Sequence, residues 1–144
     1  MGQDLLEEIT ANWKVDAVMN MDYLHKESIR IPQLHGKYFE YQTRLTKLKL
    51  KYKKDLDVLT LKKFHYYSGK ADPREYVDTD FGFKILKADI PIYLNADSEI
   101  NELKMKLEYT QYILDFVKDI IKQIHNRTFQ IKNYIEYRKF DVGH

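Results

Sequence analysis

The chain has 144 residues, of which 44% are hydrophobic and 14% aromatic, and its formal net charge is only +2. That composition is typical of one folded domain and excludes a disordered chain. The absence of cysteine excludes disulfides, a thiol nucleophile and cysteine-bound zinc. The sequence shows neither the start of a signal peptide nor a run near the ~20 apolar residues of a membrane span, so we expect a soluble protein of the cytoplasm with no membrane contact.

Residues 4–13 are predicted to form a short amphipathic helix. Leu5, Leu6, Ile9 and Trp13 fall on one side of that helix. The pattern of residues 22–31 does not decide between helix and loop.

A second, longer helix is expected to begin at Pro32, because proline suits a first helical turn. Gly36 weakens that turn, and Ser68 and Gly69 are expected to end the helix, with Gly69 as its left-handed cap. The apolar residues between them recur in steps of three and four, which is typical of one helix face. They are Leu34, Tyr38, Tyr41, Leu45, Leu48, Tyr52, Leu56, Leu59 and Tyr66.

Positive charge is gathered in residues 44–70, where nine Lys or Arg face two acids, a local net charge of +7. At 100° per residue, five of these cations form a line on the side away from the apolar stripe: Arg44, Lys47, Lys51, Lys54 and Lys62. One interpretation is a solvated outer face. A solvated face usually mixes both signs, however, because Glu–Lys pairs support a helix. The scarcity of acids therefore favours an anionic partner, and the aromatic residues that follow favour single-stranded nucleic acid.

The candidate DNA contacts are the cations of this line and one aromatic ring. Tyr66 is in phase with the buried stripe, whereas Tyr67 lies about 100° further round and is the better candidate for stacking, which contributes ~1–3 kcal/mol per base. The predicted DNA-binding residues are Arg44, Lys47, Lys51, Lys54, Lys62, Lys63, Tyr67 and Lys70.

Three segments follow from this pattern: a helical, DNA-binding region 1–72, an acidic connector 73–97, and a helix 98–144 for self-association. In the connector, residues 81–86 read as a short strand. Its end, 95–98, offers residues that cap helices.

The helix after residue 98 shows a heptad pattern over about six repeats. One series is Ile100, Leu107, Leu114, Ile121, Thr128 and Ile135, and the other is Leu103, Thr110, Val117, Ile124, Ile131 and Arg138. A helix over 98–140 would be roughly 64 Å long, too long for one compact domain to cover. Either the helix breaks near 125–128, or other copies of the chain cover it. The predicted oligomerisation residues are Leu103, Leu107, Leu114, Val117, Ile121, Ile124, Ile131 and Ile135.

Motifs of enzyme chemistry are missing from the sequence: there is no phosphate-binding P-loop, glycine-rich dinucleotide loop or nucleophile elbow. The five histidines are scattered and form no pair at the spacing of helical metal ligands. We therefore expect no catalytic residue, no metal and no cofactor. Hydrolase or nuclease activity would need a metal-ligating cluster that the sequence lacks.

Several short motifs, in order along the chain, carry a resemblance to a known family. They are Asp4-Leu5 with Glu7-Glu8, Tyr66-Tyr67-Ser68-Gly69-Lys70 with Asp72, Lys84 with Leu86 and Ala88-Asp89, Tyr112 with Ile113-Leu114-Asp115-Phe116, and Arg127-Thr128-Phe129 with Ile131-Lys132. Together they resemble the UvsY family of phage recombination mediators, and they are densest from residue 61 onward.

This resemblance implies a specific function. Members of the family bind single-stranded DNA, assemble as closed oligomers of six or seven subunits through their carboxy-terminal part, and help a RecA-like recombinase of the UvsX type to displace the phage single-strand-binding protein. It also implies a location in the host cytoplasm. The family's DNA binding depends on two cations, two residues apart, before the Tyr-Tyr-Ser-Gly run. Lys63 matches the second, Leu61 occupies the first position, and Lys62 is the candidate replacement.

We therefore expect a mainly α-helical protein with long paired helices forming an oligomeric assembly, with a minor strand in the connector. The expected function is recombination mediation through single-stranded DNA. The alternative is a structural helical adaptor that oligomerises and binds a protein partner without DNA. The two differ in whether the chain is retained on single-stranded DNA at low salt.

Overall fold

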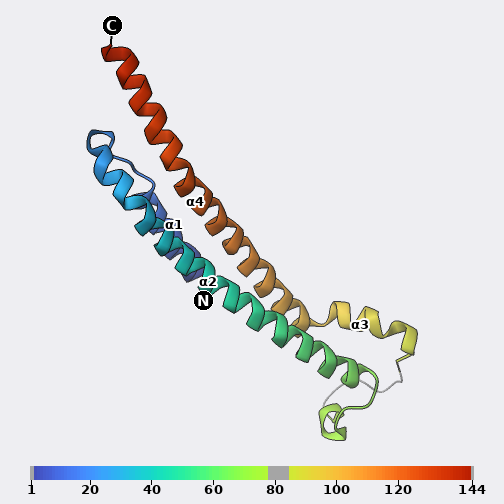
Figure 1. Ribbon diagram of the computed structural model, residues 1–144. Helices are drawn as coiled ribbons and strands as arrows, with labels where there is room; N and C mark the ends of the chain where they lie inside the picture. Colours follow the sequence, from blue (N-terminus) through green and yellow to red (C-terminus); the bar gives the residue numbers. More distant parts are fainter. Residues whose placement is uncertain (1, 78–84, 144) are drawn as a thin grey trace. The chain divides into compact units, whose positions relative to one another are not determined.

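The computed structural model describes residues 2–77 and 85–143, and the chain is helical throughout its main elements (Figure 1). In order they are α1 (Gly2–Asp16), η1 (Met21–Tyr23), α2 (Leu24–Tyr67), η2 (Pro73–Tyr76), η3 (Lys87–Asp89), α3 (Ile90–Ala96) and α4 (Ser98–Val142). The predicted mainly α-helical class is confirmed. Of the strand predicted at 81–86, residues 81–84 lie outside the described part, and residues 85 and 86 have no strand structure.

Helix α2 begins eight residues earlier than the sequence pattern indicated, so the prediction that Pro32 stands in its first turn is wrong. The Asn20 side chain accepts a hydrogen bond from the backbone N–H of Asp22 at 3.0 Å and starts the helical path through η1. Pro32 then lies inside α2. Proline at that position removes one backbone hydrogen-bond donor. Tertiary packing of the helix outweighs this loss, and α2 continues through Pro32.

The end of α2 is a Schellman motif centred on Gly69. The helix ends at Tyr67, and Gly69 has φ = 77°, a conformation that glycine adopts without strain. The N–H of Gly69 donates to the Tyr66 carbonyl at 3.1 Å, and the N–H of Lys70 donates to the His65 carbonyl at 2.9 Å. The predicted glycine cap is confirmed.

Helix α4 is continuous over 45 residues, about 68 Å at the usual rise of 1.5 Å per residue. The predicted capping segment supplies its start, because Asp97 Oδ1 accepts a hydrogen bond from the Ile100 N–H at 3.0 Å. The alternative of a break near residues 125–128 is wrong.

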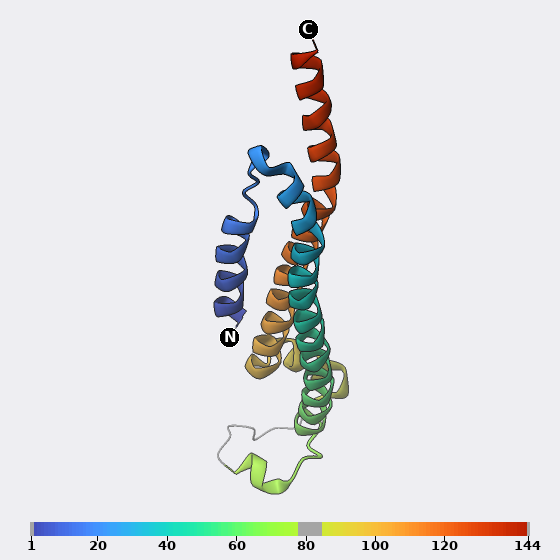
Figure 2. The ribbon, with the colours of Figure 1, turned by 60° about the vertical axis from the view of Figure 1, so that its left-hand side comes forward.

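The described chain divides into two compact units. The boundary between them falls after Lys47 in α2 and before Thr110 in α4, although both helices are continuous. In the first unit, α1, the first half of α2 and the larger part of α4 lie side by side (Figures 1 and 2). The ring of Trp13 meets that of Tyr38 edge-on, with centroids 5.5 Å apart. The apolar core of this unit is formed by Ile9, Leu34, Tyr38, Leu45, Ile113, Leu114, Val117, Ile120, Ile124 and Ile131.

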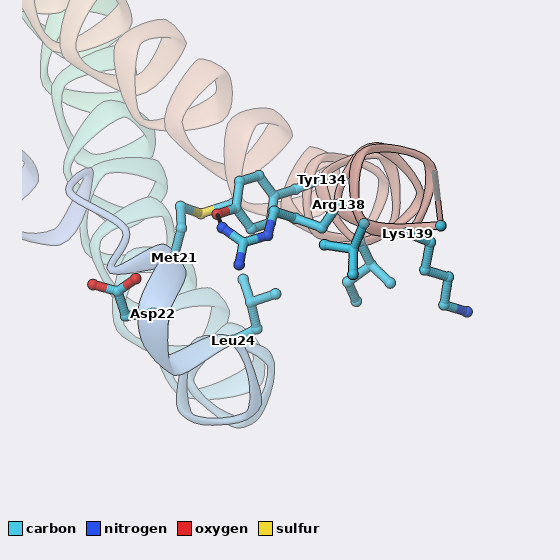
Figure 3. A pocket seen from close by; sticks show the side chains of 9 residues that line it. Met21, Asp22, Leu24, Tyr134, Arg138 and Lys139 are labelled. Atoms are coloured by element: carbon cyan, nitrogen blue, oxygen red, sulfur yellow. Dashed lines mark hydrogen bonds between the residues drawn. The ribbon is translucent and has the colours of Figure 1, made fainter.

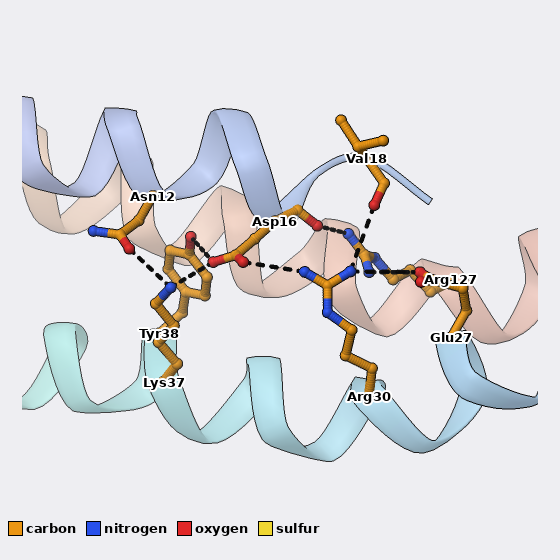
Figure 4. A network of polar contacts seen from close by, with 8 residues as sticks. All are labelled: Asn12, Asp16, Val18, Glu27, Arg30, Lys37, Tyr38 and Arg127. Atoms are coloured by element: carbon orange, nitrogen blue, oxygen red, sulfur yellow. Dashed lines mark hydrogen bonds and ion pairs between the residues drawn. The ribbon is translucent and has the colours of Figure 1, made fainter. Parts of the chain in front are cut away.

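A polar network centred on Asp16 joins the helices of the first unit (Figure 4). The Asp16 carboxylate accepts hydrogen bonds from Lys37 Nζ at 2.7 Å, the Tyr38 hydroxyl at 2.8 Å and Arg30 Nη2 at 3.1 Å. Burial alone would raise the pKa of Asp16, but these three partners together lower it. The end of α1 is therefore tied to α2 through an ionised carboxylate.

Arg127 extends this network into α4. Its side chain is 3% exposed, and its Nη2 donates to the backbone carbonyl of Asp16. Its Nη1 lies 3.8 Å from Glu27 Oε2, an ion pair with no direct hydrogen bond. Arg127 thus connects α4 to both other helices of the unit.

The second unit contains the end of α2, the short helices η2, η3 and α3, and the start of α4. The rings of Tyr66 and Tyr76 are stacked, with centroids 5.1 Å apart and planes 14° from parallel. The Tyr76 hydroxyl donates to the Tyr66 carbonyl at 2.7 Å. This contact holds η2 against the last turn of α2.

Candidate nucleic-acid interface

Five of the predicted cations of α2 are exposed, and we call them the basic row: Arg44, Lys47, Lys51, Lys54 and Lys62. Arg44 has a weak, exposed ion pair with Glu8 at 3.9 Å. Among residues 2–77 and 85–143, the four lysines of the row have no carboxylate within 4.0 Å. One acid, Asp55, falls within the row by helical spacing. The row therefore presents four exposed ammonium groups that have no ion pair among the described residues.

Lys63 has a different environment from Lys62, although the two are neighbours. The Lys63 side chain is 18% exposed, and its Nζ lies 3.3 Å from Asp97 Oδ2 and 3.4 Å from Glu99 Oε2. Its ammonium is thus compensated within the second unit.

Tyr67 is also engaged inside the protein rather than presented as an open stacking surface. Its hydroxyl donates to Asp97 Oδ2 at 2.6 Å, and its ring lies 5.7 Å from that of Tyr93 and 5.2 Å from that of Tyr66. Burial first, then the bond to Asp97, raise the pKa of Tyr67. Its assignment as a DNA contact stays a prediction.

Asp97 is the residue whose role sequence reasoning found only in part. The capping position was predicted, but the two side chains that converge on Asp97 come from residues 30 and more positions earlier. Burial would raise the pKa of Asp97, but the Tyr67 hydroxyl, the Ile100 N–H and Lys63 together lower it. The Asp97 carboxylate is therefore ionised at neutral pH, and both of its oxygens have partners within the protein.

Lys70 and Lys62 meet at an open hollow of about 420 Å³ at the end of α2, which is also lined by His65, Asp72 and Glu75. Asp72 is bound to Arg74, whose Nη2 lies 2.9 Å from Asp72 Oδ2. The exposed pair of carboxylate and guanidinium lowers the pKa of Asp72. The structure thus brings together two predicted cations that are eight residues apart in sequence.

Most of the predicted oligomerisation residues face the chain's own helices. Four of them are buried in the first unit: Leu114, Val117, Ile124 and Ile131. Three are half-buried, namely Leu103, Leu107 and Ile121. Ile135 is the most exposed of the set, at 37%. The heptad pattern therefore describes packing within the chain for its central part, and its role between copies stays a prediction.

The final turns of α4 carry large apolar side chains that are mostly exposed to solvent. Phe129, Tyr137, Phe140 and Val142 are between 64% and 75% exposed. Of these four, Val142 lines an open hollow of about 610 Å³, together with Met21, Leu24, Ile135 and polar residues that include Arg138 (Figure 3). By helical spacing, Phe129, Tyr137 and Phe140 lie within about 80° of one another on α4, and exposed apolar side chains on one face are typical of an interaction surface.

Two further features concern metals and membranes. The rings of His35 and His125, from α2 and α4, lie 5.1 Å apart, a proximity that sequence spacing could not indicate. Within the described residues, however, no third His, Asp or Glu joins them or any other pair as a metal site requires. Among the same described residues, no helix contains an apolar stretch that is long enough to cross a bilayer.

Long helices with a row of exposed lysines along α2 are typical of one class, that of helical proteins that bind nucleic acid. The family model described as recombination, repair and ssDNA binding protein UvsY matches residues 12–144. The chain therefore belongs to the UvsY family of recombination, repair and ssDNA-binding proteins.

Solved structures of one family member share this fold. A crystal structure of the bacteriophage T4 recombination mediator protein UvsY matches with a TM-score of 0.81 at 24% identity, over 94% of this chain and 98% of the T4 chain. Another lattice of the same protein matches with a TM-score of 0.80 at 25% identity, over 96% and 98% of the two chains. Among curated protein sequences none matches significantly.

Proposed function

We propose that this protein assembles as a homo-oligomer, binds single-stranded DNA along the basic row, and promotes loading of a RecA-like recombinase onto DNA coated by a single-strand-binding protein. The observation that carries the proposal is the row of four lysines without carboxylate partners. Family membership supports the ligand. The recombinase of the UvsX type and the phage single-strand-binding protein are the partners that the resemblance implies.

Assembly raises the affinity for DNA above that of a single row. A single row offers only a few phosphate contacts, so one chain would release DNA readily at physiological salt. Copies joined in one particle, six or seven by the family resemblance, raise the effective concentration of rows around one strand. Such a particle can hold and bend the strand while a coat protein leaves and recombinase subunits enter. No nucleotide is needed for that step.

Salt dependence tests the ligand. We expect the logarithm of the affinity for an oligodeoxythymidine to fall linearly with the logarithm of salt concentration, with a slope near −0.7 for each phosphate contacted. Replacing Lys51, Lys54 and Lys62 with glutamine should flatten the slope by about 2 and leave the particle size unchanged. A salt-independent affinity would contradict the proposal.

A protein-binding adaptor is the second candidate, and one observation favours it. Leu50, Val58 and Leu61 are each about 60% exposed on α2, among the lysines of the row. An adaptor would pass through a single-stranded DNA column at low salt, and charge reversal of the row would leave its partner binding intact.

A further inference from the structure

Asp97 joins two helix ends of the second unit through one buried carboxylate. It is 6% exposed. Its Oδ1 caps α4 by accepting from the Ile100 N–H, while its Oδ2 accepts from the Tyr67 hydroxyl at 2.6 Å and lies 3.3 Å from Lys63 Nζ. We call Asp97, Lys63 and Tyr67 the Asp97 latch. The latch ties the last turns of α2 to the first turn of α4.

The two neighbouring lysines at this point of α2 are physically different. Lys62 is exposed, and in the described part of the chain no carboxylate lies within 4.0 Å of it. Lys63 is shared between Asp97 and Glu99. To bind Lys63, a phosphate would have to displace two carboxylates and leave Asp97 buried with less compensation, which is unfavourable. Lys62 meets neither obstacle.

We propose that the Asp97 latch is a positioning device, which fixes the end of α2 so that Lys62 and Lys70 face the DNA strand, and that Lys63 and Tyr67 do not contact the strand themselves. This inference rests on the proposed function. Lys62 precedes the cap at Gly69 by two helical turns, and Lys70 follows it directly. Loosening the last turns of α2 would therefore displace both cations from their shared hollow.

Electrostatics and positioning make opposite predictions for Asp97, and this makes the inference testable. An acid near a DNA site repels phosphate, so neutralising it normally strengthens binding. Neutralising a positioning residue weakens binding instead. Glu99 is a matched control, because it is bound to the same ammonium but is 65% exposed and does not cap the helix.

The first experiment compares Asp97→Asn with Glu99→Gln by fluorescence anisotropy with labelled oligodeoxythymidine at one salt concentration. Asparagine still caps helices well, so this variant keeps the start of α4 and loses the oxygen that accepts from the Tyr67 hydroxyl and pairs with Lys63. We expect Asp97→Asn to bind several-fold more weakly and Glu99→Gln to bind equally or more tightly. Tighter binding by Asp97→Asn would overturn the proposal.

The second experiment measures salt slopes for Lys62→Gln and Lys63→Gln. Removing a phosphate contact lowers the slope by about 0.7. We expect that loss for Lys62→Gln. For Lys63→Gln we expect no change of slope, because its complex would regain the Lys62 and Lys70 contacts once the end of α2 is re-ordered, and the cost of that ordering should lower the affinity at every salt concentration. An equal loss of slope in both variants would show that Lys63 contacts the strand, and the proposal would be wrong.

The third experiment needs no DNA. At one protein concentration, Lys63→Gln, Tyr67→Phe and Asp97→Asn should each lower the melting temperature, and combining Lys63→Gln with Asp97→Asn should add little to the larger single effect. Lys62→Gln should leave the melting temperature unchanged. Fully additive shifts would refute the latch. If the parent protein does not bind single-stranded DNA, the proposed function fails, while these melting temperatures still decide whether the latch exists.

Discussion

Single buried charges decide much of the packing in this protein. Arg127 is 2% exposed, and its guanidinium is held by the Asp16 carbonyl and the Glu27 carboxylate. Burial, followed by Arg30, lowers the pKa of Arg127, whereas Glu27 and Asp16 raise it. A buried ion pair adds little net stability, but removing one partner leaves the other charge uncompensated. The arrangement therefore makes the register between α4 and the other two helices specific.

Replacement of Arg127 by methionine tests this account. Glu27 then keeps its ion pair with Arg30, at 3.6 Å, and the Asp16 carbonyl loses its donor, so we expect the free energy of unfolding to fall by about 1–3 kcal/mol, measured by chemical denaturation. The double variant Arg127→Met with Glu27→Leu should recover part of the loss, since it removes both charges. A double variant as unstable as the single one would contradict the explanation.

Acid should destabilise the protein through Asp16 and Asp97. Both have a pKa lowered in the folded state, so their contribution to stability is complete above the unfolded pKa of about 3.9 and is lost as pH falls through the folded pKa. We expect the melting temperature, followed by circular dichroism, to fall steeply below about pH 4. Asp97→Asn should show a shallower fall than the parent protein, and an equal fall would argue against the contribution of Asp97.

At the scale of elements, Gly36 inside α2 and Gly69 just after its end have opposite roles. Gly69 is the left-handed cap with φ = 77°, whereas Gly36 lies inside the helix, and a Cβ added there would meet no atom within 4 Å. Helix propensity therefore decides the effect of a substitution at Gly36, and cap geometry decides it at Gly69.

Alanine at each position should separate these effects. We expect Gly69→Ala to lower the free energy of unfolding by about 1–2 kcal/mol, because a left-handed conformation strains any Cβ. Gly36→Ala should raise it by roughly 0.5–1 kcal/mol. Urea denaturation measures both, and two changes of the same sign would contradict this assignment.

For the whole molecule, the apolar end of α4 is the surface best suited to self-association. Phe140 and Tyr137 are 70% and 64% exposed, in contrast to the buried heptad residues Val117 and Ile124. Residues already buried within the chain are poor candidates for contacts with another copy, so we place the proposed interface at the exposed end.

Substitution at that end should disrupt assembly without unfolding the chain. We expect Tyr137→Ser with Phe140→Ser to lower the particle mass, measured by light scattering over a range of concentrations, because exposed rings contribute to association and not to the core. The helical circular dichroism signal should be unchanged at the same concentrations. An unchanged mass would place the interface elsewhere.

Periodicity determined the main elements from the sequence alone, because spacings of three and four residues report a helix face wherever it packs. The cap at Gly69 and a capping segment at 95–98 were equally readable, since both depend on local backbone geometry, but which residue of that segment caps α4 was not. The start of α2 was not, because packing holds Pro32 inside a helix that local preference would end there.

Charge density and composition by themselves determined that this chain carries a basic helix and a long apolar one. Only the tertiary structure decided which lysines are free, since Lys62 and Lys63 differ through carboxylates more than 30 residues away in sequence. It also decided that the centre of the heptad series is covered by the chain's own α1 and α2. Both decisions depend on pairing between distant segments, and the energy of a charge or an apolar side chain is set by those neighbours, not by its own position in the chain.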